Sequence, residues 1–153
     1  ELLPLFAPNV NSFRRFLPDT SAPVNVEWGE ENRTVGLRVP DSDPQNRRVE
    51  NRLAGADANP YLAAAAILAG IHRGIRDRLD PGAPIEGNGY VQAKERLPTE
   101  WSAAIQALEC SDWARDAFGA DFLKVFLAVK RAEYRQFMGE VGEQDWRWYL
   151  NHA

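Results

Sequence analysis

One short stretch of the sequence alternates charged side chains of opposite sign. Residues 47–52 are Arg-Arg-Val-Glu-Asn-Arg. If this stretch is a strand, Arg48, Glu50 and Arg52 share one face, because side chains alternate along a strand. Burying such ions costs several kcal/mol each unless partners are supplied. The stretch therefore predicts either a closed ladder of ion pairs or a ligand site, and taken alone it leaves both open.

Arginine dominates the basic residues of this chain. Of the 18 lysine and arginine residues only three are lysines. Arginine makes planar, bidentate contacts with carboxylate or phosphate better than lysine does. Arg38 faces away from the apolar side of the strand expected over 34–39, so neighbouring strands would bring it to the charged face of 47–52. Such a surface suits a polyphosphate whose charge is shared between arginines and a metal ion held by Glu50.

The elements that must position these residues change character near residue 60. Before it, prolines separate short runs of β type, and after it the apolar pattern is helical. We expect an extended loop over 1–24 and strands over 24–28, 34–39 and 48–53. Three short strands joined in this way predict an antiparallel sheet with one apolar and one polar face.

Helices are expected throughout the remainder of the chain. Asn59 and Pro60 form a strong helix start, because asparagine is a good N-cap and proline suits the first helical position. This helix is expected to end near Leu79. After a loop rich in glycine and proline, Thr99 and Ser111 are each expected to cap a further helix.

The end of the chain is also expected to be helical. Apolar residues recur at helical spacing over 121–137 and predict a long amphipathic helix. A last helix over 144–150 holds Trp146, Trp148 and Tyr149, which fit a subunit contact and core packing equally well. The predicted fold class is α+β, with short antiparallel strands in the first third followed by a helical bundle.

The overall composition limits the classes of function. The chain has 153 residues, 44% of them hydrophobic, and a net charge of −4, as expected for one soluble globular domain. The acidic balance and the scarcity of lysine oppose binding to nucleic acid or to an anionic membrane. Cys110 is the only cysteine, so an internal disulfide is excluded and a reducing, cytoplasmic location is expected. No apolar run is long enough to span a membrane.

Other kinds of active site find little support in the sequence. His72 has no second histidine, aspartate or cysteine at metal spacing on its helix face. No glycine-rich phosphate loop of a common type is present. Ser12 and Ser21 have no evident base, so a nucleophilic mechanism is unsupported. The arginines and Glu50, the only acid of the first third placed within a strand between arginines, remain as the candidate site.

A series of short motifs in the sequence resembles the carboxy-terminal part of the glutamine synthetase catalytic domain. The resemblance covers essentially all 153 residues, and the ordered series is specific although each motif alone is weak. In detail the chain looks most like the γ-glutamylpolyamine (γ-glutamylputrescine) synthetase branch, which ligates glutamate to amines. The motifs are Asn11-Ser12-Phe13-Arg14-Arg15, Ala22-Pro23, Glu31-Asn32-Arg33, Leu37-Arg38-Val39-Pro40, residues 47–52 and Asn59-Pro60-Tyr61-Leu62.

The resemblance implies a site that uses ATP and Mg²⁺ (or Mn²⁺). By its motif position Glu50 matches a metal ligand, and Arg33 matches the arginine that stabilises the transferring phosphate. Arg33 and Arg52 are the implied catalytic residues. The implied nucleotide contacts are Arg33, Arg38 and Arg48. The implied contacts to glutamate and its phosphorylated intermediate are Arg15, Arg33 and Arg52.

The implied reaction has two steps. The glutamate γ-carboxylate attacks ATP to give γ-glutamyl phosphate, and an amine then displaces the phosphate. Because Arg33 and Arg38 differ by an odd number of positions, Arg33 is expected on the loop before its strand. Ser21 stands where ammonia-using relatives carry a glutamate that helps to deprotonate ammonium. This departure favours an organic amine as acceptor, and leaves open an ammonia-using enzyme or a non-catalytic scaffold.

The resemblance also implies that this chain is a fragment. Residues 1–58 would form the loop and strand segment with the arginine-rich site, and residues 59–153 the helical segment of a partial catalytic domain. The amino-terminal domain, the other metal carboxylates and the metal histidine of the family lie upstream of anything present. Because family members form their sites between subunits of stacked rings, we expect a ring-shaped homo-oligomer for the full-length protein and no activity from the fragment alone.

Overall fold

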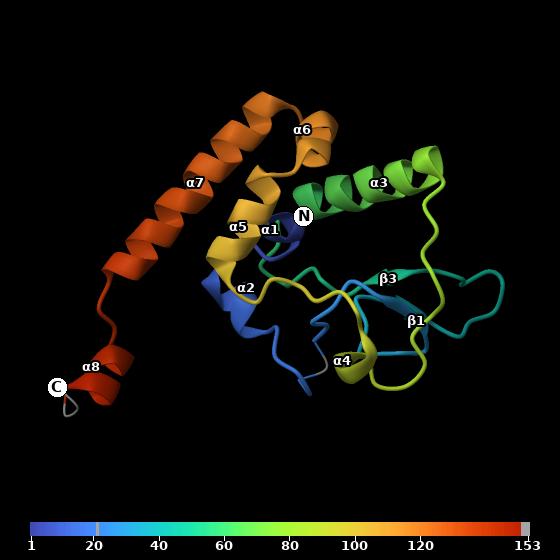
Figure 1. Cartoon of the computed structure of the whole chain (residues 1–153), viewed down its shortest axis with the longest axis horizontal. Helices are drawn as coiled ribbons and strands as arrows, with labels where there is room; N and C mark the ends of the chain where they lie inside the picture. The colour runs from blue at the N-terminus through green and yellow to red at the C-terminus, as the bar shows by residue number, and fades with distance from the viewer. Residues whose placement is uncertain (21, 151–153) are drawn as a thin grey trace.

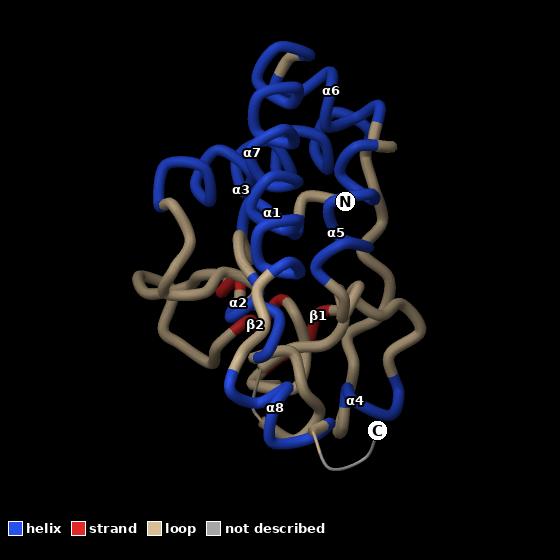
Figure 2. Tube along the Cα trace, turned by 90° about the vertical axis from the view of Figure 1, so that its left-hand side faces the viewer, coloured by secondary structure: helices blue, strands red, loops and turns tan. Residues whose placement is uncertain are grey.

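Two regions make up the fold, as seen in a computed structural model that describes residues 1–20 and 22–150. The helices α1, α3, α5, α6 and α7 gather on one side, and a small sheet with long loops and the short α4 lies on the other (Figure 1 and Figure 2). This arrangement confirms the predicted α+β class. The strands are β1 (Trp28–Glu30), β2 (Leu37–Val39) and β3 (Glu50–Asn51). The helices are α1 (Leu3–Phe6), α2 (Val10–Arg14), α3 (Pro60–Asp77), α4 (Gly89–Gln92), α5 (Trp101–Glu109), α6 (Asp112–Phe118), α7 (Ala120–Gly139) and α8 (Glu143–Tyr149).

The sheet has β2 at its centre. β2 pairs antiparallel with β3, as predicted, but it pairs parallel with β1, so the expectation of a wholly antiparallel sheet is wrong. The reason lies in the connection after β1. Glu31 has a positive φ of 45°, and the Asn32 side chain accepts hydrogen bonds from the Thr34 backbone N–H (2.9 Å) and hydroxyl (2.6 Å). These local bonds turn the chain back, so that β2 runs alongside β1 in the same direction.

The segment predicted as the first strand, 24–28, is held by a buried side chain together with backbone hydrogen bonds to residues 95–97. Asn25 forms an isolated bridge with Arg96, and β1 begins only at Trp28. The Asn25 side chain is fully buried. Its amide nitrogen donates to the Thr34 carbonyl (2.9 Å), and its Oδ1 accepts from the Gly36 N–H (3.2 Å). These side-chain bonds tie the segment to the turn before β2.

The first 24 residues were expected to be loop but contain α1 and α2. Asn9 caps α2, because its Oδ1 accepts hydrogen bonds from the backbone N–H groups of Asn11 (2.9 Å) and Ser12 (3.3 Å). The Ser12 hydroxyl in turn accepts from the Asn9 N–H at 3.2 Å, which completes a capping box. Asn9 and Ser12 therefore start a helix within the segment that was expected to be an extended loop, and the neighbouring Phe13 enters the core.

The starts of α3 and α6 follow the sequence signals, whereas α4 lies in the stretch that was expected to be a loop. Asn59 caps α3 through the N–H groups of Tyr61 and Leu62, and Ser111 caps α6 through the N–H of Ala114 at 3.0 Å. The expected cap Thr99 is wrong, since Glu100 occupies the N-cap position of α5 without a side-chain cap bond. Within the described residues, no helix is both long and apolar enough to cross a membrane.

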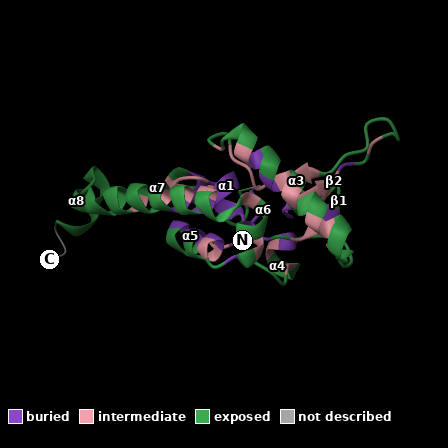
Figure 3. Ribbon diagram, turned by 90° about the horizontal axis from the view of Figure 1, so that it is seen from above, coloured by how far each residue is buried: buried purple, intermediate pink, exposed green. Residues whose placement is uncertain are grey.

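The core lies between α1, α3, α5 and α7. Its fully buried members include Leu5, Ala104 and Leu108. The far end of α7 and the whole of α8 extend away from this core and are largely exposed (Figure 3). Trp146 and Trp148 are 57% and 58% exposed. The prediction that these aromatic residues pack in a core within this chain is therefore wrong. A subunit contact stays a prediction.

Candidate functional site

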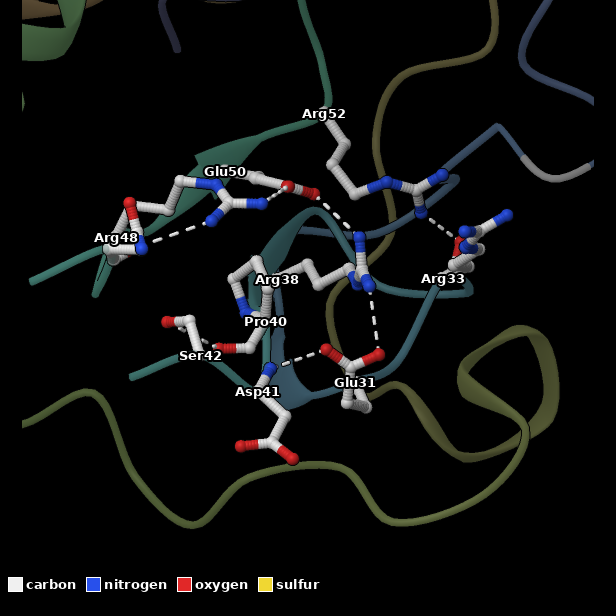
Figure 4. A network of polar contacts seen from close by, with 10 residues as sticks. Glu31, Arg33, Arg38, Pro40, Asp41, Ser42, Arg48, Glu50 and Arg52 are labelled. Carbon is white, nitrogen blue, oxygen red and sulfur yellow. Dashed lines mark hydrogen bonds and ion pairs between the residues drawn. The ribbon is translucent and has the colours of Figure 1, made fainter. Parts of the chain in front are cut away.

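The candidate site centres on Arg38 in the middle strand of the sheet. In the antiparallel register Arg38 lies opposite Glu50, so both side chains emerge on the same face. Arg38 Nη1 donates to Glu50 Oε2 at 2.9 Å, and Arg38 Nη2 donates to Glu31 Oε2 at 2.8 Å. The Arg38 side chain is only 14% exposed. One guanidinium is thus held between two carboxylates from different strands and turns (Figure 4).

Glu50 connects Arg38 to a second arginine. Arg48 Nη2 donates to Glu50 Oε1 at 3.3 Å, so both oxygens of the Glu50 carboxylate accept from guanidiniums. Burial by itself would raise the pKa of Glu50. The hydrogen bond and charge of Arg38, followed by those of Arg48, outweigh burial and hold the pKa of Glu50 below its usual value. The carboxylate therefore stays ionised across the neutral range.

Glu31 is the second carboxylate on Arg38, and it comes from the turn that follows β1. Its Oε2 accepts from Arg38, and its Oε1 accepts a short hydrogen bond from the backbone N–H of Asp41. The hydrogen bond from Arg38 and then the one from Asp41 lower the pKa of Glu31. In the same way, the bond to Glu31 raises the pKa of Arg38 despite partial burial. These shifts describe a tightly coupled ion-pair cluster.

Arg33 and Arg52 extend the same surface. Arg33 lies in the turn between β1 and β2 and is exposed, as expected from its spacing to Arg38. A guanidinium N–H of Arg52 donates a short hydrogen bond to the Arg33 backbone carbonyl, so the residue after β3 holds this turn. Burial lowers the pKa of Arg52, and the nearby charges of Arg38 and Arg33 add to that effect. Figure 4 shows both arginines beside the Arg38 cluster.

Arg15 approaches the site from α2 and contacts backbone carbonyls. It is the C-cap residue of α2, and its guanidinium donates to the carbonyls of Arg52 and Leu53 just after β3. It also lies over the Phe16 ring, with 4.9 Å between the guanidinium carbon and the ring centroid. Burial lowers its pKa, and the nearby Asp57 opposes that shift. Arg15 therefore fixes the chain that carries Arg52.

The structure brings the six predicted site residues into one neighbourhood, but in two layers. Arg38, Arg48 and Glu50 form direct ion pairs. Arg15, Arg33 and Arg52 are linked to one another through backbone carbonyls. Ser21, the residue expected to distinguish this chain from ammonia-using relatives, lies outside the described residues. Sequence reasoning missed Glu31, because alternation along strands says nothing about a residue in a turn.

The arrangement suits anions of high charge better than it suits a metal ion alone. Arg33 and Arg48 are exposed and carry guanidiniums that match phosphate geometry. Glu50 offers one carboxylate, which is the kind of oxygen ligand that Mg²⁺ takes in proteins. Among residues 1–20 and 22–150, no group of three or more histidine, cysteine, aspartate or glutamate side chains is placed to hold a metal. A metal ion here would take Glu50 as one ligand and further ligands from elsewhere.

An open depression adjoins the ion-pair cluster. Its volume is about 580 Å³, and its walls include Glu31 and Arg33 on one side and the loop at Ile85 on the other. Asn32 holds the two walls together, because its amide nitrogen donates to the carbonyls of Ile85 (3.0 Å) and Gly87 (2.9 Å). One end of the cluster, at Glu31 and Arg33, therefore borders a space large enough for a small polar ligand.

Known proteins match this chain along nearly its whole length. The family described as glutamine synthetase, catalytic domain, matches residues 1–149. Gamma-glutamylputrescine synthetase PuuA of Escherichia coli is 44% identical over 149 residues, which are 97% of this chain and 32% of that protein. Gamma-glutamylethanolamide synthetase GlnA4 of Streptomyces coelicolor is 39% identical over 142 residues, covering 93% of this chain and 30% of that protein.

Relatives named glutamine synthetase and a solved structure complete the comparison. The glutamine synthetase of Methanocaldococcus jannaschii is 32% identical over 157 residues, covering 97% of this chain and 35% of that protein. A solved structure of a GmaS/ADP complex superposes with a TM-score of 0.84 at 33% identity, over 98% of this chain and 36% of that one. The chain thus spans about a third of the length of these relatives. It belongs to the glutamine synthetase family and corresponds to part of the catalytic domain of that family.

Proposed function

We propose that this chain is part of an ATP-dependent ligase that joins the γ-carboxylate of glutamate to an amine through γ-glutamyl phosphate. The observation that carries the proposal is the ion-pair cluster of Arg38, Arg48 and Glu50, in a chain of the glutamine synthetase family. Phosphoryl transfer needs mainly positioning and neutralisation of charge, and this cluster supplies guanidiniums and a carboxylate on one face.

Each site residue has a proposed role. Arg38 and Arg48 contact the phosphates of ATP, and Glu50 is one ligand of a Mg²⁺ or Mn²⁺ ion that neutralises charge on those phosphates. Arg33 stabilises the transferring phosphoryl group from its exposed turn. Arg52 and Arg15 hold glutamate and its phosphorylated intermediate. Because Arg52, Arg33 and Arg15 are linked through backbone carbonyls, these three roles depend on a common local geometry.

The preferred acceptor in this proposal is a polyamine or another organic amine. Two relatives whose names specify an amine product are 44% and 39% identical to this chain. Ser21 has no carboxylate to act as a base toward ammonium. Ammonia is the second candidate, because proteins named glutamine synthetase also match nearly the whole chain, at 32% identity in the case above.

The proposed site is completed outside this chain. The described residues offer only Glu50 as a proposed metal ligand, and the relatives are about three times as long. We propose that the full-length protein is a cytoplasmic, ring-shaped homo-oligomer whose amino-terminal domain faces this arginine cluster. The exposed aromatic residues of α8 support a subunit interface at α8, because exposed tryptophan is unfavourable in water.

The test is a steady-state assay of the full-length protein for ATP hydrolysis with glutamate and a panel of amines. The panel holds putrescine, a longer polyamine, ethanolamine, a monoamine and ammonia. Glutamate and one amine should together stimulate ATP hydrolysis. Glu50→Ala or Arg33→Ala should each reduce the turnover rate by about 10²-fold or more. Arg135→Ala, on the exposed side of α7, is the matched control.

Two outcomes would overturn the proposal. If neither Glu50→Ala nor Arg33→Ala changes nucleotide binding or turnover, the site assignment is wrong. The 153-residue chain alone should show no ATP-dependent ligation, because it provides one side of the proposed site. Measurable turnover by the isolated chain would contradict the fragment interpretation.

A further inference from the structure

The two carboxylates on Arg38 are held in different ways. Glu50 lies on β3, an edge strand that is two residues long. Glu31 is fixed at three points around the end of β2: its N–H donates to the Val39 carbonyl at 3.0 Å, its Oε1 accepts from the Asp41 N–H, and its Oε2 accepts from Arg38. Glu31 is thus anchored to β2, whereas the Glu50 side chain forms its ion pairs with Arg38 and Arg48.

The backbone at Glu31 indicates that this arrangement is specifically maintained. Its φ of 45° lies in the left-handed region, which is uncommon for glutamate. Such a residue persists only where its surroundings determine it, and strained positions gather at functional sites. The turn that contains Glu31 also carries Arg33, and Figure 4 shows Glu31 on the far side of Arg38 from Glu50.

We propose that Glu31 is a positioning residue, which holds Arg38 in place when Glu50 leaves its ion pairs to bind a metal ion. This inference rests on the proposed function. Arg38 is 14% exposed, so its guanidinium needs a carboxylate partner whether or not a ligand is bound. With Glu31 present, Glu50 can change partners while Arg38 stays paired and keeps the orientation in which it meets a phosphate.

Removal of Glu31 should make Arg38 compete with the metal ion for Glu50. In a Glu31→Gln variant, Glu50 becomes the only carboxylate within reach of Arg38 among the described residues. Departure of Glu50 would then leave a largely buried guanidinium without a charged partner. Removal of a residue that orients a metal ligand typically lowers metal affinity by about 10- to 100-fold.

The experiment measures binding of Mn²⁺ to the full-length protein by electron paramagnetic resonance, with ATP present and glutamate and amine absent. Glu31→Gln should raise the dissociation constant of Mn²⁺ by about tenfold or more. Glu30→Gln is the matched control, because Glu30 is the neighbouring residue at the end of β1, is exposed, and forms no ion pair with an arginine within the part of the chain that the structure describes. Equal effects of the two variants, or no effect of Glu31→Gln, would overturn the inference.

Two further arms separate the inference from the proposed function. In an Arg38→Gln background, Glu31→Gln should change Mn²⁺ affinity no further, because the guanidinium that it holds is gone; an undiminished effect would contradict the positioning role. A Glu50→Gln variant that binds Mn²⁺ as tightly as the parent would overturn the proposed metal role itself.

A structure of the unmodified full-length protein with ATP and Mg²⁺ tests the inference without any variant. Arg38 should remain within hydrogen-bonding distance of Glu31 while Glu50 is no longer paired with Arg38. An Arg38 side chain that has left Glu31 in that complex would overturn the inference, whatever the variants show.

Discussion

The sheet region and the helical region of this chain are stabilised in opposite ways. In the sheet region, charged side chains pair with one another across adjacent strands, as Arg38 of β2 does with Glu50 of β3. In the helical region, large apolar side chains are left in solvent: Leu68, Ile75 and Val125 are 65%, 75% and 65% exposed. Figure 3 shows this exposure along α3 and α7. The charged side chains around Arg38 therefore find partners within this chain, whereas these apolar side chains of the helices do not.

This difference follows from how much apolar surface each region can bury. Strands of two or three residues cover too little area to form a core of their own. Their geometry depends on directional contacts, namely ion pairs and side-chain bonds to the backbone. Helices of 18 and 20 residues, α3 and α7, present far more side chains than α1 and α5 can cover. Exposed apolar faces of this size are typical of surfaces that contact other chains or domains.

The largest effect should come from matched leucine substitutions in the two regions. Leu108 in α5 is fully buried, whereas Leu37 in β2 is only partly buried. Leu108→Ala should lower the free energy of unfolding of the chain by about 2–5 kcal/mol, because a buried leucine leaves a cavity. Leu37→Ala should lower the free energy of unfolding by less than about half of that amount, because Leu37 is only partly buried. Urea unfolding measures both, and equal losses would show that the sheet region has a core of its own.

Sequence reasoning succeeded where a signal was local and failed where it depended on distant contacts. Asn59, Pro60 and Ser111 predicted helix starts correctly, because a cap bonds to the backbone two or three residues away. The parallel pairing of β1 and β2 was missed, since it depends on a turn whose Asn32 side chain bonds to the Thr34 N–H and to the backbone carbonyl of Ile85 in a distant loop. Strand alternation placed Arg38, Arg48 and Glu50 on one face, but it had no means to bring Glu31 to Arg38.

The second prediction concerns the acid sensitivity of the polar region. The pKa values of Glu31 and Glu50 both lie below their usual 4.5 in the folded chain. Carboxyls of this kind contribute stability that is present above the unfolded pKa and is lost as the pH falls through the folded pKa. The chain should therefore lose stability on acidification below about pH 4.5. Arg38→Gln should weaken this dependence, because it removes the guanidinium that stabilises both anions.

Thermal unfolding between about pH 7 and about pH 3 measures this effect. Arg135→Gln removes one positive charge from the exposed surface of α7 and serves as the control, because it lowers the net charge equally without touching either carboxylate. If the two variants lose stability in parallel with the parent over that range, the cluster does not control the acid limb, and the polar region is less self-contained than its contacts indicate.

The third prediction separates a true helix cap from an apparent one. Ser111 accepts a hydrogen bond from the Ala114 N–H at 3.0 Å, so Ser111→Ala should destabilise the chain by about 1 kcal/mol. Thr99 is one residue before the N-cap of α5, which has no side-chain cap bond, so Thr99→Ala should change stability by less than about 0.5 kcal/mol. A larger loss for Thr99→Ala in urea unfolding would mean that α5 begins at Thr99 in solution.

The smallest effect should come from the exposed face of α3, and it decides how the comparison between regions is interpreted. Ile75 is 75% exposed, so Ile75→Gln should change the free energy of unfolding of the isolated chain by less than about 0.5 kcal/mol. It should also reduce binding of a hydrophobic dye. A loss above about 1 kcal/mol in the isolated chain would mean that this face is already packed. If the loss appears only in the full-length protein, the apolar face of α3 is covered there by residues outside this chain.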